Sequence, residues 1–357
     1  MLWSTIRMGK YLGLKDDGVY YAAKRETEFL NFYEKNWSEI LSDTYYKSEQ
    51  LDIGHKFRPR LVYWGFIMNG YNRLSNYDFD MVSKVAVCIE LVHKASILLD
   101  DFIDQDTARH GRPTFHTIYG IDRTVIYSLN ILSRSLKILN HTFYSYSDSN
   151  IFMWKSMDAL TTTLEEMTLG VLKELELPEQ LSQNINDIRE IMCLETGALI
   201  TNSLLMGMYL TRIDNSVAIK IVEKIGRKFG FIFQALNDLE PFCNSKNSDH
   251  KGSINTDFSR NRKNICVSLL YPFLSSEEIS LIKNSKRAGK DDLIIRYFKK
   301  YQIYDSIMDE LNNTHASMLI DINELRDKMP ELDPQWPSEF TQFVNSVIKI
   351  CKNRISE

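Results

Sequence analysis

Apolar side chains recur at helical spacing along most of this chain, and the pattern predicts an all-α fold. In residues 20–46 the large apolar side chains lie mostly three or four positions apart, as they do on one face of an amphipathic helix. They are Phe29, Leu30, Tyr33, Trp37, Ile40 and Leu41. Glycine and proline, with 15 and 8 residues, are both scarce in a chain of 357 residues, which favours helices over a turn-rich sheet. We therefore expect almost no β-strand.

Three later segments are apolar on nearly every side, which predicts helices buried in a core rather than helices lying on the surface. They span residues 81–104, 188–210 and 218–239. A more peripheral helix is expected to begin after Ser275, because Ser275 and Glu278 have the spacing of a capping box.

The C-terminal part of the chain is marked by a proline-containing segment. Residues 329–337, MPELDPQWP, contain three prolines, which are not tolerated in a helix interior. This segment predicts a linker, followed by a final amphipathic helix over residues 338–353. We therefore expect one helical domain over residues 1–328, with the linker and C-terminal helix of residues 329–357 packed on it.

Composition and charge limit what the protein can bind. A net charge of −4 provides no basic field of the kind that nucleic-acid backbones require, so nucleic acid is not an expected partner. The five cysteines are scattered and form no C-x-x-C pair, which indicates reduced thiols and predicts a cytoplasmic protein. Residues 1–10 lack the apolar core of a signal peptide, and no run of about 18 apolar residues predicts a transmembrane segment.

The acidic end of the first buried segment, LLDDFIDQD, carries the clearest chemical signal. Asp100 and Asp104 lie four positions apart, so on a helix both carboxylates project from one face, with His93 seven positions earlier on that face. Mg²⁺ prefers one or two carboxylates together with water and substrate phosphates. The spacing therefore predicts a platform for Mg²⁺ and a diphosphate.

A solvated acidic helix end is the simpler interpretation of a D-D-x-x-D pattern. Here the acids end a helix that is too apolar for the surface, so we expect Asp100, Asp101 and Asp104 to be buried and to need a counter-charge. Arg109 and Arg112 follow in TARHGRPTFHTIYG, where a glycine and a proline predict a loop. These arginines can supply the expected positive charge.

A family resemblance is carried by the run ELVHKASILLDDFIDQDTARHGRPTFHTIYG, which resembles the first aspartate-rich motif of the trans-polyprenyl diphosphate synthases. The similarity continues in order from Gly54 to about Leu270. It implies the isoprenoid synthase type I fold, a single-domain antiparallel helical bundle around a deep central cavity, and a homodimer. It also implies Mg²⁺-dependent ionisation of an allylic prenyl diphosphate.

The same resemblance implies a role for each residue of the first motif. Asp100 and Asp104 would bind two Mg²⁺ ions, and Asp101 would be a weaker or indirect ligand. Arg109 would clamp the allylic diphosphate. The implied catalytic residues are therefore Asp100, Asp101, Asp104 and Arg109.

Other blocks resemble further motifs of this family. GHKFRPR resembles the basic motif for isopentenyl diphosphate, ETGAL the helix-break motif, FGFIFQALNDLEP the second aspartate-rich motif, and NTDFSRNRKN the segment after it. The substrate-binding residues that these blocks and the first motif imply are Lys56, Arg58, His93, Arg109, Thr196, Gln234 and Arg262. The second aspartate-rich motif implies a third Mg²⁺ on Asn237 and Asp238.

The chain departs from the family pattern at positions that handle diphosphate charge. His55 and His110 stand where the family has a lysine and an arginine, and Glu195 replaces the lysine before Thr196. A neutral histidine offers a hydrogen bond where the family offers a full positive charge. Binding of isopentenyl diphosphate is therefore expected to be weaker or changed.

The second aspartate-rich motif departs most from the pattern. Its three acids appear as Asn237, Asp238 and Pro241, so the third Mg²⁺ is expected to bind poorly, and Glu240 is a candidate to replace the lost acid. Pro241 also removes a helical hydrogen bond and restricts the residue before it. The helix is therefore expected to end near Leu239.

Several functions are compatible with these residues. Chain elongation with isopentenyl diphosphate is favoured by Arg58 and His93. A terpene synthase is favoured by the changed acceptor motif, although NDLEP lacks the usual asparagine-serine-glutamate triad of those enzymes. Prenyl transfer to a non-isoprenoid nucleophile would use the same acids. A regulatory subunit without chemistry is a fourth hypothesis, against which the intact first motif argues.

Two small residues before the first aspartate, Ala95 and Ser96, bear on the length of the prenyl chain that the protein accepts. Family members with short products carry a bulky aromatic about one turn before the first aspartate, where this chain has Ala95 and Ser96. The small side chains leave room for a tail, so we expect the protein to accept farnesyl or longer diphosphates.

Overall fold

The computed structural model describes residues 24–45, 51, 56–69, 75–109, 111–145, 151–177, 184–212, 214–243, 263–287 and 292–356. Three residues singled out from the sequence, His55, His110 and Arg262, lie outside these described residues. The predictions made for them therefore remain predictions.

Helices form almost all of the regular structure in the described residues. In chain order they are α2 Lys24–Ser42, α3 Phe57–Phe66, α4 Asn76–Ile103, α5 Phe115–Tyr119, α6 Ile121–Ser145, α7 Ile151–Glu176, α8 Ile185–Met192, α9 Ala198–Leu210, α10 Ser216–Cys243, α12 Ile265–Leu270, α13 Ser276–Arg287, α14 Asp292–Lys300, α15 Ile303–Lys328 and α16 Trp336–Ser356. A π-helical turn, Cys193–Gly197, joins α8 to α9, and 3₁₀ turns at Ile67–Asn69 and Tyr271–Phe273 follow α3 and α12. Strands β1, Ala108–Arg109, and β2, Arg112–Pro113, pair as an antiparallel ladder. The prediction of an all-α fold with almost no strand is confirmed.

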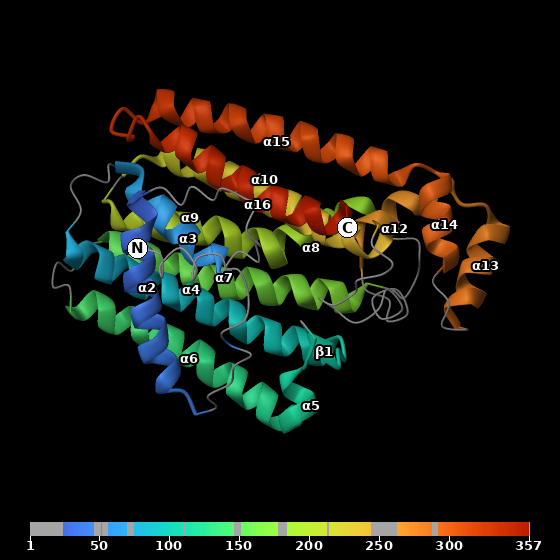
Figure 1. Ribbon diagram of the computed structural model, residues 1–357, viewed down its shortest axis with the longest axis horizontal. Helices are drawn as coiled ribbons and strands as arrows, with labels where there is room; N and C mark the ends of the chain where they lie inside the picture. Colours follow the sequence, from blue (N-terminus) through green and yellow to red (C-terminus); the bar gives the residue numbers. More distant parts are fainter. Residues whose placement is uncertain are drawn as a thin grey trace.

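The long helices pack side by side around α9 (Figure 1). Every residue of α9 except Tyr209 is buried, and the helix packs against α3, α7 and α10. Helix α4 packs against α2, α3 and α6, while α15 and α16 both pack against α10. Figure 1 shows α15 at the upper edge of the bundle and α6 at the lower edge. The first aspartate-rich motif therefore ends a helix that is covered along most of its length.

Helices α3 and α9 approach closely where each carries a glycine. A Cβ added at Gly65 would lie 2.0 Å from the backbone oxygen of Leu204, and one added at Gly207 would lie 1.9 Å from the backbone oxygen of Val62. A side chain at either position would force the two helices apart. The glycines therefore hold α3, which has the basic motif at its N-terminus, against the centre of the bundle.

The predicted buried helix over residues 188–210 is longer and less regular than expected. Regular helix starts at Ile185 and is interrupted by the π-helical turn at residues 193–197. By length and composition alone, Ile185–Leu210 is apolar enough to cross a membrane, but 78% of its most apolar window is buried inside the described bundle. It therefore fits the interpretation as a core helix.

The predicted end of α10 near Leu239 is wrong, because the helix continues through Pro241 to Cys243. Proline removes one backbone donor and clashes with the preceding turn, but here only two helical residues follow it. Leu239 and Phe242 are buried, and the ring of Phe242 lies 4.7 Å from that of Phe298 on α14. Burial of the last turn therefore outweighs the local preference of proline.

The C-terminal helix begins at Trp336 rather than at Ser338, so the proline-containing linker ends two residues earlier than predicted. Pro337 lies in the first turn of α16, where its missing N–H group is not needed for a helical hydrogen bond. The indole Nε1 of Trp336 donates a 2.7 Å hydrogen bond to the backbone oxygen of Trp64, and its ring stacks on Phe340. These buried contacts fasten α16 to α3.

The capping box predicted at Ser275 is confirmed. The backbone N–H of Ser275 donates to Glu278 Oε2 at 2.9 Å, and the backbone N–H of Glu278 lies 3.2 Å from Ser275 Oγ. Helix α13 begins at the next residue, Ser276.

Candidate active site

The first aspartate-rich motif lies at the C-terminal end of α4. The helix begins with a capping box between Ser75 and Asp78 and ends at Ile103, and the backbone N–H of Asp104 donates to the backbone oxygen of Asp100 at 2.8 Å. Asp100 and Asp104 are therefore one helical turn apart, as predicted.

The expectation that all three acids are buried is wrong. Asp101 is buried, with 3% of its surface exposed, whereas Asp104 is half-buried and the side chain of Asp100 is 49% exposed. Asp100 and Ile103 are exposed in the last turn of α4, whereas Asp101 points to the covered side of the helix. Asp100 is thus placed to meet a ligand from solvent.

A short hairpin brings Arg109 back to these acids. Strands β1 and β2 are joined through Gly111, whose φ of 70° is readily adopted only by glycine. Nε of Arg109 donates to Asp101 Oδ1 at 2.5 Å, and Nη2 donates to Asp100 Oδ2 at 3.0 Å. The segment predicted as a loop therefore positions Arg109 as the counter-charge, while Arg112 is exposed.

Burial and ion pairing together shift the pKa values of Asp101 and Arg109. Burial raises the pKa of Asp101 to about 6, although Arg109 opposes the rise. Burial lowers the pKa of Arg109, but Asp101 and Asp100 outweigh this effect and hold the pKa above its ordinary value. Arg109 is therefore positively charged beside the acidic motif.

One further acid in this region was missed by the sequence reasoning. Asp106 is 2% exposed, and its Oδ2 lies 4.0 Å from Nη2 of Arg109. Its backbone N–H donates to the oxygen of Asp101, and its backbone oxygen accepts a hydrogen bond from Thr114 Oγ1 at 2.6 Å. The residue follows the end of α4, so the helical spacing that identified its neighbours did not include it.

The chemistry of the motif fits Mg²⁺ bound together with a substrate. Among the described residues, no three His, Cys, Asp or Glu side chains are grouped as a closed metal site. Asp100 and Asp104 instead present carboxylates at one helix end, and Mg²⁺ is usually held by one or two carboxylates, water and phosphate oxygens. These two aspartates would hold the metal.

The basic motif lies beside His93 on α4. Nη1 of Arg58 lies 2.8 Å from Nε2 of His93, and the guanidinium group of Arg58 lies over the rings of Phe57 and Phe233. Burial lowers the pKa of Arg58 to about 10, which leaves it charged at neutral pH. Because arginine is only a donor, Nε2 of a neutral His93 accepts this hydrogen bond.

His93 connects the basic motif electrostatically to the aspartate-rich motif. Burial lowers the pKa of His93 well below its ordinary value, and three nearby cations lower it further. They are Arg58, Lys94 and Arg109. His93 is therefore neutral and lies within electrostatic reach of the cations of both motifs.

Lys56 immediately precedes α3 and has an uncommon backbone conformation. Its φ of 48° is left-handed, which side chains with a Cβ rarely adopt. The side chain is buried, and its Nζ lies 4.8 Å from the centre of the Trp37 ring. Such strain is often found at functional sites, and here it accompanies a buried cation.

Thr196, Gln234 and Asp238 form a chain of hydrogen bonds across the π-helical turn and α10. Thr196 Oγ1 donates to Gln234 Oε1, and Gln234 Nε2 donates to Asp238 Oδ1, both at 2.8 Å. Asp238 Oδ2 also accepts the backbone N–H of Ile265 at 3.0 Å. Both oxygens of this buried carboxylate therefore already accept hydrogen bonds from the protein.

The other residues of the second motif differ in their surroundings. Asn237 is half-buried, whereas Glu240 Oε2 lies 4.0 Å from Nη1 of Arg354 on α16. Glu240 therefore faces the C-terminal helix, which argues against its replacing the lost acid.

Comparison with known proteins identifies the family. A model of the polyprenyl synthetase family matches residues 42–322. The chain belongs to this family. The geranylgeranyl diphosphate synthase of Saccharolobus solfataricus is 23% identical to this polyprenyl synthetase family member over 260 residues, which cover 71% of this chain and 75% of the relative. The hexaprenyl pyrophosphate synthase of the same organism is 29% identical over 230 residues, which cover 63% of this chain and 70% of the relative.

Solved structures confirm the isoprenoid synthase fold of this family member. Geranylgeranyl pyrophosphate synthase from Corynebacterium glutamicum, complexed with isoprenyl diphosphate and magnesium, has a TM-score of 0.73 at 15% identity and covers 91% of this chain and 97% of its own. Geranylgeranyl pyrophosphate synthetase from Pyrococcus horikoshii has a TM-score of 0.70 at 20% identity. The match covers 91% of this chain and 99% of the Pyrococcus chain.

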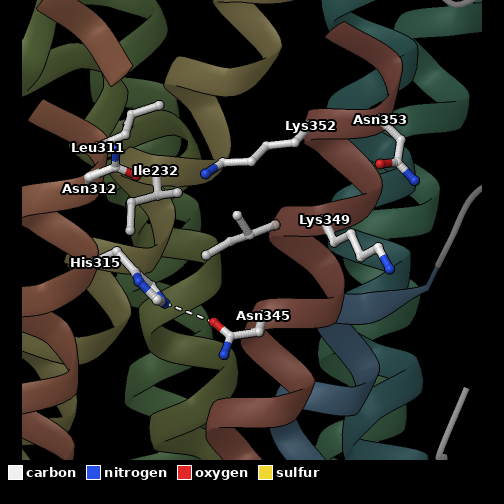
Figure 2. Close-up of a pocket in the computed structure, with 9 residues that line it drawn as sticks. Ile232, Leu311, Asn312, His315, Asn345, Lys349, Lys352 and Asn353 are labelled. Carbon is white, nitrogen blue, oxygen red and sulfur yellow. Dashed lines mark hydrogen bonds between the residues drawn. The ribbon is translucent and has the colours of Figure 1, made fainter. Parts of the chain in front are cut away.

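A separate groove of this family member lies between α10, α15 and α16 (Figure 2), with a volume of about 390 Å³. His315 on α15 and Asn345 on α16 form a 2.8 Å hydrogen bond across it, and Lys352 points toward α15 whereas Lys349 points away. Ile232 lines the groove from α10 and lies two positions from Gln234, so the two side chains face nearly opposite sides of that helix. The groove is therefore distinct from the candidate active site.

Proposed function

We propose that this chain is a magnesium-dependent prenyltransferase that joins an allylic prenyl diphosphate to isopentenyl diphosphate, giving a longer trans-polyprenyl diphosphate. Family membership and the names of the relatives support this activity. The observation that carries it is the presence of two basic groups around His93, one at Arg58 and one at Arg109. Two diphosphate substrates require two such groups.

The aspartate-rich end of α4 would hold the allylic diphosphate. Bound Mg²⁺ would neutralise the charge that develops on the leaving diphosphate. Asp100 and Asp104 would bind the metal, whereas Asp101 fixes the direction of the Arg109 guanidinium through Nε. Arg109 has five N–H donors, so donors remain for diphosphate oxygens after its two bonds to the aspartates.

The basic motif would hold isopentenyl diphosphate. Lys56 and Arg58 supply positive charge, and neutral His93 has a ring N–H to donate because its other nitrogen accepts from Arg58. The acceptor's double bond would then attack the allylic cation, and the new carbocation would lose a proton to the released diphosphate to give the longer product. Buried apolar side chains would exclude water from both cations. Thr196, Gln234 and Arg262 remain proposed allylic-site residues from the resemblance.

Two Mg²⁺ ions on the first motif are proposed, with a weak third site at Asn237 and Asp238. The weakness is supported by the hydrogen bonds that already reach both oxygens of Asp238. A terpene synthase on the same scaffold is the second candidate. The changed acceptor motif, with His55 in place of a lysine, favours it, whereas NDLEP, which lacks the asparagine-serine-glutamate triad of those enzymes, argues against it. Transfer to a non-isoprenoid acceptor would leave the same ionisation site in use.

The test is incubation of the purified protein with Mg²⁺ and farnesyl or geranylgeranyl diphosphate, with and without isopentenyl diphosphate. Products are extracted and analysed by mass before and after phosphatase treatment. A longer diphosphate that forms only with isopentenyl diphosphate supports the proposal. A hydrocarbon or alcohol formed equally well without it would identify a terpene synthase, and the absence of any Mg²⁺-dependent diphosphate release would favour a regulatory subunit.

We also propose a homodimer that forms through α6 and α7. Both helices expose large apolar side chains, including Ile126 and Leu129 on α6 and Leu172 and Leu175 on α7, which are 52–66% exposed. Exposed apolar groups of this size are typical of protein interfaces. Sedimentation should give a dimer for the wild type and a monomer for Leu172→Glu/Leu175→Glu, and a monomeric wild type would contradict the proposal.

The cytoplasm is the proposed compartment. All five cysteines are free thiols, including the half-buried Cys193 and Cys243, and free thiols suit a reducing environment. Cell fractionation would test this assignment.

A further inference from the structure

Lys94 is a buried lysine that has no role in the function proposed so far. It is 3% exposed and follows His93 on α4. Its Nζ lies 3.2 Å from Oε1 of Glu90, which is 1% exposed and one helical turn earlier. A lysine is rarely buried this completely unless an anion compensates its charge.

Other cations lie close to this pair. Burial lowers the pKa of Lys94, Glu90 opposes the change, and the positive charges of Lys56 and Arg58 lower the pKa further. Glu90 in turn stabilises the charge of Arg58. Lys56, Arg58 and Lys94 therefore belong to one electrostatic group, although Lys56 and Arg58 lie at the start of α3 and Lys94 lies on α4.

The charges in this group favour an anionic ligand. Lys56, Arg58 and Lys94 are all cations, Glu90 is the carboxylate that raises the pKa of both Lys94 and Arg58, and the ring of His93 is neutral. The buried Nε of Arg58 has no hydrogen-bond acceptor among the described residues. Lysine has three N–H donors, so Lys94 can keep its contact with Glu90 and still donate to a second anion. A diphosphate would supply both the negative charge and the acceptor oxygens.

We propose that Lys94 binds the diphosphate of the acceptor, isopentenyl diphosphate, together with Lys56 and Arg58. This inference rests on the proposed function and assigns a third positive charge to the acceptor site. Lys94 thereby restores part of the charge that His55 does not provide. The competing explanation is that Lys94 only neutralises the buried carboxylate of Glu90.

The experiment compares wild type with Lys94→Met and with Glu90→Gln/Lys94→Met, which removes both buried charges. Loss of a hydrogen bond to a charged group predicts a rise of at least about tenfold in the KM for isopentenyl diphosphate in both variants. The KM for the allylic diphosphate should stay within about twofold, because the aspartate-rich motif is unchanged. If Lys94 only neutralises Glu90, the double variant has the wild-type acceptor KM, and the inference is wrong.

Lys84→Met is the matched control, because Lys84 forms an i,i+4 ion pair with Asp80 on the same helix but is 34% exposed. It should leave both KM values unchanged. Titration calorimetry with isopentenyl diphosphate alone gives a readout that needs no turnover. If the wild type does not elongate, the proposed function fails, whereas the calorimetric comparison still decides whether Lys94 binds this diphosphate. Equal affinity in wild type and the double variant would overturn the inference.

Discussion

Adjacent aspartates in the first motif have different surroundings and therefore different roles. Asp100 is exposed at the end of α4, whereas Asp101 is buried and receives Nε of Arg109. The buried carboxylate fixes the arginine, and the exposed one can reach a metal. Asp101 thus holds the positively charged Arg109 in place, and Asp100 remains exposed to bind a metal ion.

Arg109 should therefore matter far more than the other arginine of the hairpin. Replacing Arg109 with Met removes a positioned donor for the leaving diphosphate and should lower kcat by at least about 100-fold. Arg112→Met, on the exposed strand, should retain most of the activity. Steady-state rates with Mg²⁺ and both substrates check this, and equal losses in the two variants would contradict the role of Arg109.

Ala95 provides a residue-scale test of substrate length. It is fully buried on α4, about one turn before Asp100. Ala95→Phe should shift the products toward shorter chains, because the larger ring would occupy space that the prenyl tail needs. Product lengths are measured by mass, and a preference identical to that of the wild type would refute the prediction. Ser96→Ala, which changes little volume, is the control.

At the scale of single elements, local signals were reliable where neighbouring residues decide the structure. The capping box at Ser275 and Glu278 begins α13 as its spacing predicted. Pro241 shows the opposite case, because its local preference to end α10 is overcome by the burial of Leu239 and Phe242 against other helices. The difference lies in how much packing each site adds to the local preference.

The capping box also gives a pH-dependent prediction. Hydrogen bonds from Lys300 and from the backbone of Ser275 hold the pKa of Glu278 at about 2, below its ordinary 4.5. The ionised carboxylate therefore stabilises the fold above pH 4.5, and this contribution is lost as the pH falls toward 2.

Glu278→Gln should consequently lower the melting temperature at pH 7, and the difference from the wild type should shrink at pH 4 and below. Thermal unfolding monitored by circular dichroism measures this. Glu277→Gln changes the neighbouring carboxylate and should have a smaller effect. A difference that stayed constant with pH would contradict the role assigned to the Glu278 charge.

At the scale of the whole molecule, α16 fastens the C-terminal segment to the centre of the bundle. Trp336 is fully buried, and Phe340 and Phe343 lie 6.0 and 5.8 Å from the ring of Trp64 on α3. Helix α3 also begins next to Lys56, so the C-terminal helix supports the element that carries the basic motif. The sequence alone left the position of this helix undecided.

Trp336→Ala should lower the free energy of unfolding by about 3–5 kcal/mol, because it leaves a large cavity and removes the hydrogen bond to Trp64. Urea denaturation at a fixed protein concentration measures this change. Ile320→Ala, at a side chain that is 67% exposed on α15, should change it by less than about 0.5 kcal/mol. A similar decrease in the free energy of unfolding in both variants would contradict the prediction that the contacts of Trp336 hold α16 against α3.

The amino-acid sequence by itself determined the helices and the acidic face of α4, because helical periodicity depends only on residues within a few positions of one another. It therefore placed Asp100 and Asp104 together without knowledge of any other helix. The tertiary structure decided which of the acids is buried, how Arg109 reaches them, and that Lys94 shares its surroundings with Lys56 and Arg58. Burial and charge pairing depend on which helices pack together, and that packing brings together residues far apart in the chain.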